Sequence, residues 1–172
     1  EGTWRGRAGQ LERPAGEQQR SLPPGPAVAL LPSEAAPWPA ATGADGGWRM
    51  LGQARDAHNR PEFRSTNDAL LVRESVRPVL DVQDAVLVRR FEVQRVQGAS
   101  DDVIWVRAAV AESIETSAEH PRGEHFVTDD GLDLLVRGGE ARLVTTDAGR
   151  ELRVALDPGP AETALLELEL RW

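Results

Sequence analysis

Cysteine, tyrosine and lysine are absent from this chain of 172 residues, and all 20 basic residues are arginines. Without cysteine the protein forms no disulfide, offers no thiolate nucleophile and binds no zinc through sulfur. The same absence excludes covalent attachment of a c-type haem to this chain. Because a chain without cysteine suits oxidising and reducing compartments equally, cysteine usage does not indicate where the protein resides.

Long hydrophobic runs are also absent. No stretch approaches the roughly 20 consecutive apolar residues of a membrane-spanning helix, so we expect no direct membrane span. The net charge of −8 argues against nucleic acid as a partner, because such binding needs a positive surface that displaces counterions from phosphates. The sequence begins at Glu1, and we expect a signal peptide or membrane anchor to precede it, with an expression tag as the open alternative.

Residues 1–45 are interrupted by seven prolines, at positions 14, 23, 24, 26, 32, 37 and 39. Each proline fixes φ and removes a backbone donor, so neither a long helix nor a central strand can continue through this segment. Short strands are predicted at residues 3–7 and 27–31. The remainder should form an irregular arm that lies across the domain surface, held there by Trp4, Leu22 and Trp38.

From residue 46 onward, apolar and charged residues alternate. Leu166, Leu168 and Leu170 alternate with Glu167 and Glu169, and similar patterns occur over residues 104–110, 132–136 and 152–156. This period of two predicts strands with one buried face. In residues 86–96 the apolar positions change from even to odd numbers, which predicts a β-bulge near Arg89 and Arg90.

Turn sequences separate these runs. Asp-Asp-Gly at 129–131, Asp-Ala-Gly at 147–149 and the segment 56–61 are typical of hairpin turns. Their spacing predicts roughly ten strands, and no segment has a helical pattern longer than two turns. We therefore expect an all-β fold: an antiparallel, jelly-roll-like β-sandwich over residues 46–172 with a proline-rich arm over residues 1–45, together one globular domain.

Candidate catalytic and metal-binding residues are few. His120 and His125, with acidic residues just upstream at positions 112, 115 and 119, form a possible metal site. However, the Pro-Arg-Gly sequence between them gives no common face, which favours a polar loop. The adjacent carboxylates at 101–102 and 129–130 cannot face each other across a cleft, as a glycosidase requires. We predict no enzyme activity, no catalytic residue, no metal and no cofactor.

Tryptophan and arginine are the informative side chains. Trp38 is stiffened by Pro37 and Pro39 and, with Trp4, is a candidate contact for a protein partner, because tryptophan is enriched at interface hot spots. Trp48, Trp105 and Trp172 are expected in core or anchoring positions. Arginines expected on outer sheet faces, opposite glutamates, are Arg73, Arg77, Arg89, Arg90, Arg95, Arg107, Arg137 and Arg153. A solvated face is favoured there, and a protein-binding face is the alternative.

One resemblance rests on short motifs in residues 4–64. These are Trp-Arg-Gly-Arg at 4–7, the Leu-Pro-Pro-Gly-Pro stretch from residue 22, Pro-Trp-Pro at 37–39, the strand-like segment 48–56 and Arg-Pro-Glu-Phe-Arg at 60–64. This order resembles the β-rich module that accompanies c-type cytochrome domains in large secreted proteins of planctomycetes and their relatives. The chain has Gly52-Gln53 where that module has Gly-Tyr. The resemblance implies a location outside the cytoplasm, near cytochromes.

We therefore expect a non-catalytic accessory subunit on the periplasmic side of a membrane electron-transfer complex, respiratory or photosynthetic. It would contact a c-type cytochrome or another protein subunit through its arm, with Trp4, Pro37, Trp38 and Pro39 as the binding residues. Such an interface predicts an exposed apolar patch near the arm. The alternative is a carbohydrate-binding β-sandwich, in which Trp38 or Trp105 stacks on sugar rings.

Overall fold

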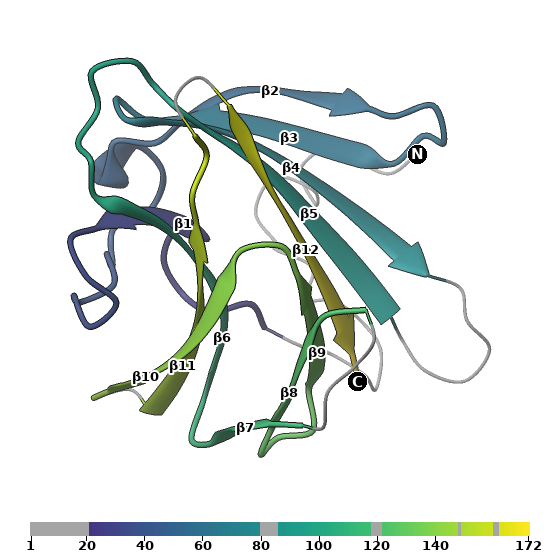
Figure 1. Cartoon of the computed structure of the whole chain (residues 1–172). Coiled ribbons are helices and arrows are strands. Elements are labelled where there is room, and N and C mark those ends of the chain that lie inside the picture. The colour runs from purple at the N-terminus through teal and green to yellow at the C-terminus, as the bar shows by residue number, and fades with distance from the viewer. Residues whose placement is uncertain (1–20, 80–85, 118–121, 148, 160–161) are drawn as a thin grey trace, which may run out of the picture.

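The computed structural model describes residues 21–79, 86–117, 122–147, 149–159 and 162–172. Over these residues the chain forms two antiparallel sheets, twelve strands in all, and one short 3₁₀ turn, η2 (Gly43–Gly46). The two sheets lie face to face (Figure 1). The predicted all-β sandwich is confirmed. None of the described residues belongs to a helix with the length and apolarity that a membrane crossing requires.

The two sheets differ in size. The smaller sheet has four strands in the order β1 (Val28–Leu31), β6 (Val103–Ala111), β11 (Gly149–Leu156) and β10 (Glu140–Thr146). The larger has eight, in the order β2 (Arg49–Arg55), β3 (Pro61–Thr66), β4 (Leu70–Val79), β5 (Val86–Arg95), β12 (Thr163–Arg171), β9 (Asp133–Arg137), β8 (Glu124–Thr128) and β7 (Ile114–Thr116). The last strand of the chain, β12, therefore lies between β5 and β9 in the middle of the larger sheet (Figure 1).

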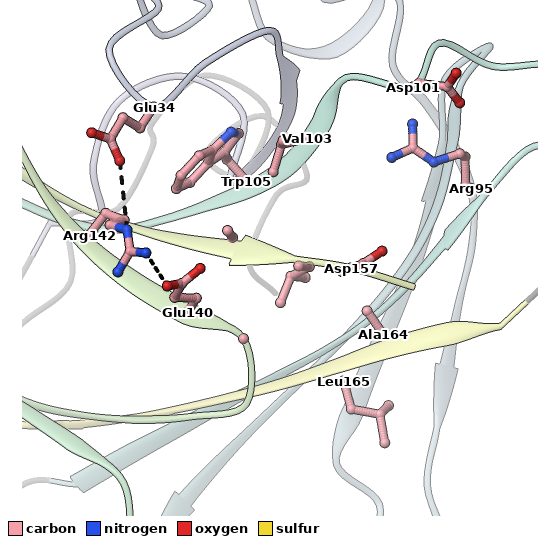
Figure 2. Close-up of a pocket in the computed structure, with 13 residues that line it drawn as sticks. Glu34, Arg95, Asp101, Val103, Trp105, Glu140, Arg142, Asp157, Ala164 and Leu165 are labelled. Carbon is pink, nitrogen blue, oxygen red and sulfur yellow. Dashed lines mark hydrogen bonds and ion pairs between the residues drawn. The ribbon is translucent and has the colours of Figure 1, made fainter. Parts of the chain in front are cut away.

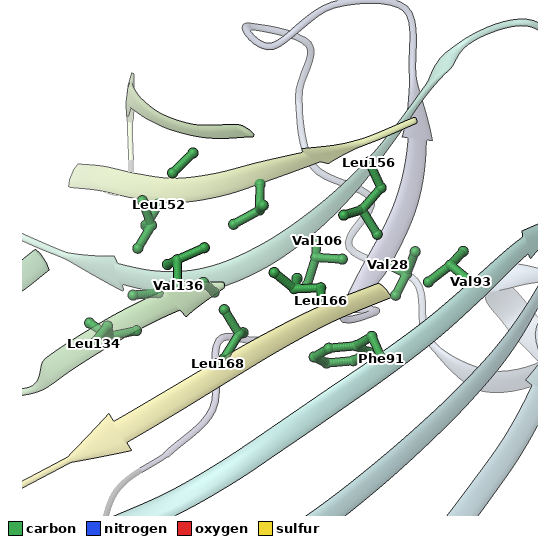
Figure 3. Close-up of a cluster of buried hydrophobic side chains, with 14 of the residues drawn as sticks. Val28, Phe91, Val93, Val106, Leu134, Val136, Leu152, Leu156, Leu166 and Leu168 are labelled. Atoms are coloured by element: carbon green, nitrogen blue, oxygen red, sulfur yellow. The ribbon is translucent and has the colours of Figure 1, made fainter. Parts of the chain in front are cut away.

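The core lies between the sheets and follows the alternation read from the sequence. Leu166, Leu168 and Leu170 of β12 point inward and are almost completely buried, while the glutamates between them face outward. Leu166 and Leu168 face Val106 of β6 and Leu152 of β11 in the smaller sheet (Figure 3), and Leu170 belongs to the same core cluster. Burying each leucine removes apolar surface from water and contributes roughly 1.5–3 kcal/mol.

The predicted hairpin turns are confirmed. The segment 56–61 joins β2 to β3, with Asn59 at a positive φ of 63°. The Asp-Asp-Gly sequence joins β8 to β9, and Gly131 N donates to Thr128 O. The third turn joins β10 to β11 through the pair Thr146 and Gly149, although Ala148 itself lies outside the described residues.

The predicted bulge near Arg89 and Arg90 is wrong. The pairing of β5 with both β4 and β12 continues without a shift through Val86–Arg95. The pattern misled because Arg89 occupies an inward position beside Phe91, where it is buried and paired with Glu74 at 2.8 Å. Register shifts occur instead in the β2–β3 pair, between Met50 and Gly52, and in the β6–β11 pair.

The outer face of the larger sheet carries the predicted cross-strand ion pairs. Arg73 of β4 lies 3.2 Å from Glu92 of β5, and Arg137 of β9 lies 2.6 Å from Glu169 of β12. Arg77 and Arg90 also pair with glutamates on this face. Arg95 departs from the pattern, because its guanidinium donates to Asp102 O in the next loop. Exposed pairs of this kind contribute less than about 1 kcal/mol each.

The proline-rich arm is partly described. The short strand expected at residues 27–31 is confirmed as β1, which pairs with β6 at the edge of the smaller sheet. The strand expected at residues 3–7, and with it Trp4, lies outside the described residues. Leu22 does not hold the arm in place, because 53% of its surface is exposed.

Candidate functional site

Trp38 holds the described part of the arm against the smaller sheet. The side chain is half-buried, and its indole Nε1 donates to Pro26 O at 2.8 Å. The guanidinium carbons of Arg107 and Arg153 lie 4.9 and 5.3 Å from its ring centre. The side chain predicted as a partner contact therefore has much of its surface in contacts within the chain, while its neighbours Pro37 and Pro39 are exposed.

Arg153 of β11 makes the main polar contacts between the smaller sheet and the part of the arm that contains Trp38. Its side chain is completely buried, and Nη1 donates to Glu34 O and Ala36 O at 2.6 and 2.7 Å. Its Nε donates to Glu151 Oε2 at 2.8 Å, and Glu151 also lies 3.6 Å from Arg107. Burial lowers the pKa of Arg107, and the Glu151 carboxylate opposes that shift. The three charged side chains form a buried Arg–Glu–Arg group.

The expectation of a solvated position is therefore wrong for Arg107 and Arg153, as it is for Arg89. Both residues do point to the outer side of the smaller sheet, but Glu34, Ala36 and Trp38 of the arm contact them there. Trp105 lies in the same layer, 5% exposed, and packs with Ala29 and Leu31. Trp48 and Trp172 pack against the main core, as expected.

The histidines form no metal site in the described part of the chain. His125 Nε2 lies 2.6 Å from Asp133 Oδ1 on the outer face of the larger sheet. His58 is exposed at the tip of the β2–β3 hairpin. No group of three or more metal-ligating side chains occurs among the described residues, and His120 lies outside them.

The paired carboxylates act as turn residues. Asp129 Oδ1 accepts from Ser113 N at 3.1 Å, and Asp130 accepts from the hydroxyl of Thr128. Asp102 N donates to the Ser100 hydroxyl within the loop before β6. None of these contacts brings two carboxylates together across a cleft.

Two large clefts lie at opposite ends of the sandwich. The first has a volume of about 740 Å³ and includes Arg95, Val103 and Leu165, which lie at the end of β5 and the beginnings of β6 and β12. The second, of about 680 Å³, includes Leu87, Val110 and Leu170 from the other ends of the same strands. Because β5 and β12 are antiparallel, the end of β5 lies beside the beginning of β12, and the beginning of β5 lies beside the end of β12. The two clefts are therefore separated by the length of the sandwich.

The first cleft is lined by charged side chains of both signs. Figure 2 shows Arg142 joined to Glu34 and Glu140 on one side, and Arg95 beside Asp101 on the other. Most of these charges already have partners within the chain. Although Trp105 contributes to the wall, its low exposure leaves no open ring face on which a sugar could stack.

The β2 edge is the feature that sequence analysis missed. We use this name for Arg49–Arg55, the terminal strand of the larger sheet, which within the described part of the chain pairs only with β3. Met50 is 68% exposed and Leu51 58% exposed, the highest values among the large apolar residues described. The sequence did contain a signal for this feature. Met50 and Leu51 are adjacent apolar residues, so they interrupt the alternation of apolar and polar residues at the point where the register of β2 shifts.

Comparisons with known proteins add no assignment: no family model, no curated protein and no solved structure matches the chain.

Proposed function

We propose that the protein is a non-catalytic binding module that docks another protein at the β2 edge. A terminal strand presents a row of unpaired backbone N–H and C=O groups, which is a template for a strand from another chain. Peptide recognition by strand addition uses these groups for affinity and the neighbouring side chains for specificity. Among the described strands, the β2 edge offers this template at one end of the larger sheet.

The observation that carries the proposal is the joint exposure of Met50 and Leu51 on that strand, at 68% and 58%. Exposed edge strands are commonly protected by charged residues or proline, because apolar side chains there promote association. Adjacent exposed apolar residues on an edge are therefore a cost unless a partner covers them. Methionine suits such a surface, because its flexible side chain adapts to different partners.

Charge indicates the chemistry of the partner segment. Residues 49–64 contain four arginines and two carboxylates, although the whole chain has a net charge of −8. Arg60 pairs with Asp56 and Arg64 with Glu62, which leaves Arg49 and Arg55 without an ion pair in the described part of the chain. An extended segment with apolar and acidic residues complements this surface.

Photo-crosslinking in the native host tests the proposal. A photoreactive amino acid replaces Leu51, and the matched control replaces Leu165, which is 51% exposed on β12. We expect position 51 to form a discrete adduct with one protein, through an apolar and acidic segment of it, and position 165 to form none. The absence of an adduct at position 51, or the same adducts at both positions, would refute docking at this edge.

The identity of the crosslinked protein tests a narrower proposal. On this proposal the module is an accessory subunit of an extracytoplasmic membrane electron-transfer complex, and the partner is a c-type cytochrome or a neighbouring subunit. Its support is the sequence resemblance over residues 4–64. Co-purification of a haem-containing complex with the protein is the expected result, and a protein that purifies alone from gently extracted membranes contradicts it.

Carbohydrate binding remains the alternative, but its two candidate residues are engaged. The ring of Trp38 contacts two guanidinium groups, and Trp105 is 5% exposed. Sugar stacking needs an open aromatic face, so this arrangement favours protein docking. Binding to a glycan array that disappears on Trp38→Ala or Trp105→Ala would reverse this preference.

A further inference from the structure

The second cleft has the character of a small-molecule site, and it is independent of the β2 edge. It opens where the two sheets separate, between the end of β6 and the end of β12. Its walls are formed mainly by Leu87, Val110, Leu132, Leu170 and Trp172, and Pro23 and Pro24 of the arm close one side. Leu170 and Trp172 also contact the main core, so the floor of the cleft is continuous with the apolar interior.

The volume is too large for a packing defect. Protein interiors are packed as densely as organic crystals, and voids larger than a water molecule are few. The cleft measures about 680 Å³, whereas sites for small molecules commonly measure roughly 300–1,000 Å³. Such sites are mainly apolar with a few polar groups that fix orientation, and they occur at the mouths of β structures.

Two of the polar residues that line the cleft, Thr128 and Asp130, are in contact with each other. Thr128 is 4% exposed, and its Oγ1 accepts from Leu132 N at 2.9 Å and donates to Asp130. The carboxylate of Asp130 also lines the cleft. No arginine or histidine occurs among the described residues of the lining. A carboxylate accepts hydrogen bonds, so Asp130 suits a ligand hydroxyl that donates one, which an ionised carboxylate ligand cannot do.

We propose that the second cleft binds a free, uncharged molecule with an aliphatic chain and a single hydroxyl group, the chemistry of a fatty alcohol. The chain lies against Leu87, Leu132 and Leu170, and the hydroxyl lies beside Thr128 and Asp130. The contribution of the chain is hydrophobic, about 0.8 kcal/mol for each buried methylene group.

The test uses the neutral fluorophore N-phenyl-1-naphthylamine as probe. We expect saturable binding of one probe per chain and displacement by 1-decanol at concentrations at least tenfold lower than by decanoate. Equal displacement by the alcohol and the carboxylate would refute the assigned ligand class. Vesicles of phosphatidylcholine test whether the cleft binds a free molecule or the acyl chain of a lipid in a bilayer. The protein should not bind the vesicles, and co-flotation with them would overturn the proposal.

Two substitutions locate the site. Leu87→Trp places a larger side chain in the cleft and should weaken probe binding at least tenfold, whereas Leu165→Trp, at the opposite end of the sandwich, should leave binding unchanged. Equal binding by both variants would contradict the proposal. Methyl NMR of the unmodified protein gives a readout that does not depend on a variant folding. On addition of 1-decanol, shifts are expected at Leu87, Val110, Leu132 and Leu170, which line the second cleft, and shifts at Val103 or Leu165 of the first cleft would overturn the assignment.

Discussion

Replacing Arg153 by methionine removes two of the hydrogen bonds that join the arm to the smaller sheet. The variant loses the bonds to Glu34 O and Ala36 O and leaves Glu151, which is 4% exposed, with only the longer contact to Arg107 at 3.6 Å. Breaking a buried ion pair on one side costs about 3–5 kcal/mol, because the remaining charge stays buried. Since small domains are stable by about 5–15 kcal/mol, the loss is a large fraction of the total.

Chemical denaturation followed by tryptophan fluorescence measures this loss. We expect Arg153→Met to lower the free energy of unfolding by about 3–5 kcal/mol and the melting temperature by roughly 6–20 °C. The control is Arg142→Met, whose side chain is 44% exposed and pairs with Glu34 and Glu140. Its loss should stay below about 1 kcal/mol.

A triple variant separates the buried charge from the lost packing. When Arg107, Glu151 and Arg153 are replaced together by Met, Leu and Met, no unpaired charge remains, so the protein should be more stable than Arg153→Met alone. The reasoning is refuted if Arg153→Met lies within about 1 kcal/mol of the unmodified protein, or if it equals Arg142→Met.

Three further predictions concern the sheets. Leu168→Ala, at a completely buried core position, should lower the free energy of unfolding by about 2–5 kcal/mol in denaturant titration. Burial raises the pKa of Glu169, but its bonds to Arg137 and the charges of Arg137, Arg122 and Arg171 together outweigh burial and hold the pKa below 4.5. Stability that is present above pH 4.5 is therefore lost as pH falls through the folded pKa. Stability measured from pH 7 to pH 2 should therefore fall less in Glu169→Gln. Gly138→Ala should destabilise by more than about 1 kcal/mol, because φ is +90° and the added Cβ would lie 2.4 Å from Leu165 O.

The strands and turns of the larger sheet could be predicted because their signals are local. Leu166 and Leu168 face the core two residues apart, and Gly131 closes a turn within its own hairpin. The same reasoning placed Arg107 and Arg153 in solvent, since a charged residue in a strand commonly faces water. What covers Arg153 is residues 34 and 36, separated from it by 119 and 117 positions, and no local pattern contains that contact.

The candidate sites were harder to predict than the fold. Trp38 was recognised as significant, but its contacts within the chain depend on two buried arginines on other strands. Met50 and Leu51 are exposed because β2 is the last strand in the order of the larger sheet. The alternation of apolar and polar residues within one strand does not indicate which strands are its neighbours in the sheet. The second cleft combines residues of the arm, β5, β6 and β12, and the sequence does not place these side by side.

Amide hydrogen exchange at the β2 edge tests the central proposal most directly. In the free protein, the amides of Met50–Ala54 that point away from β3 should exchange rapidly, while those of β5 and β12 are slow. In the complex with the native partner, the outward amides of β2 should become protected at alternate residues, the pattern of an added strand. Unchanged exchange in β2, with new protection on another surface, would contradict the proposal.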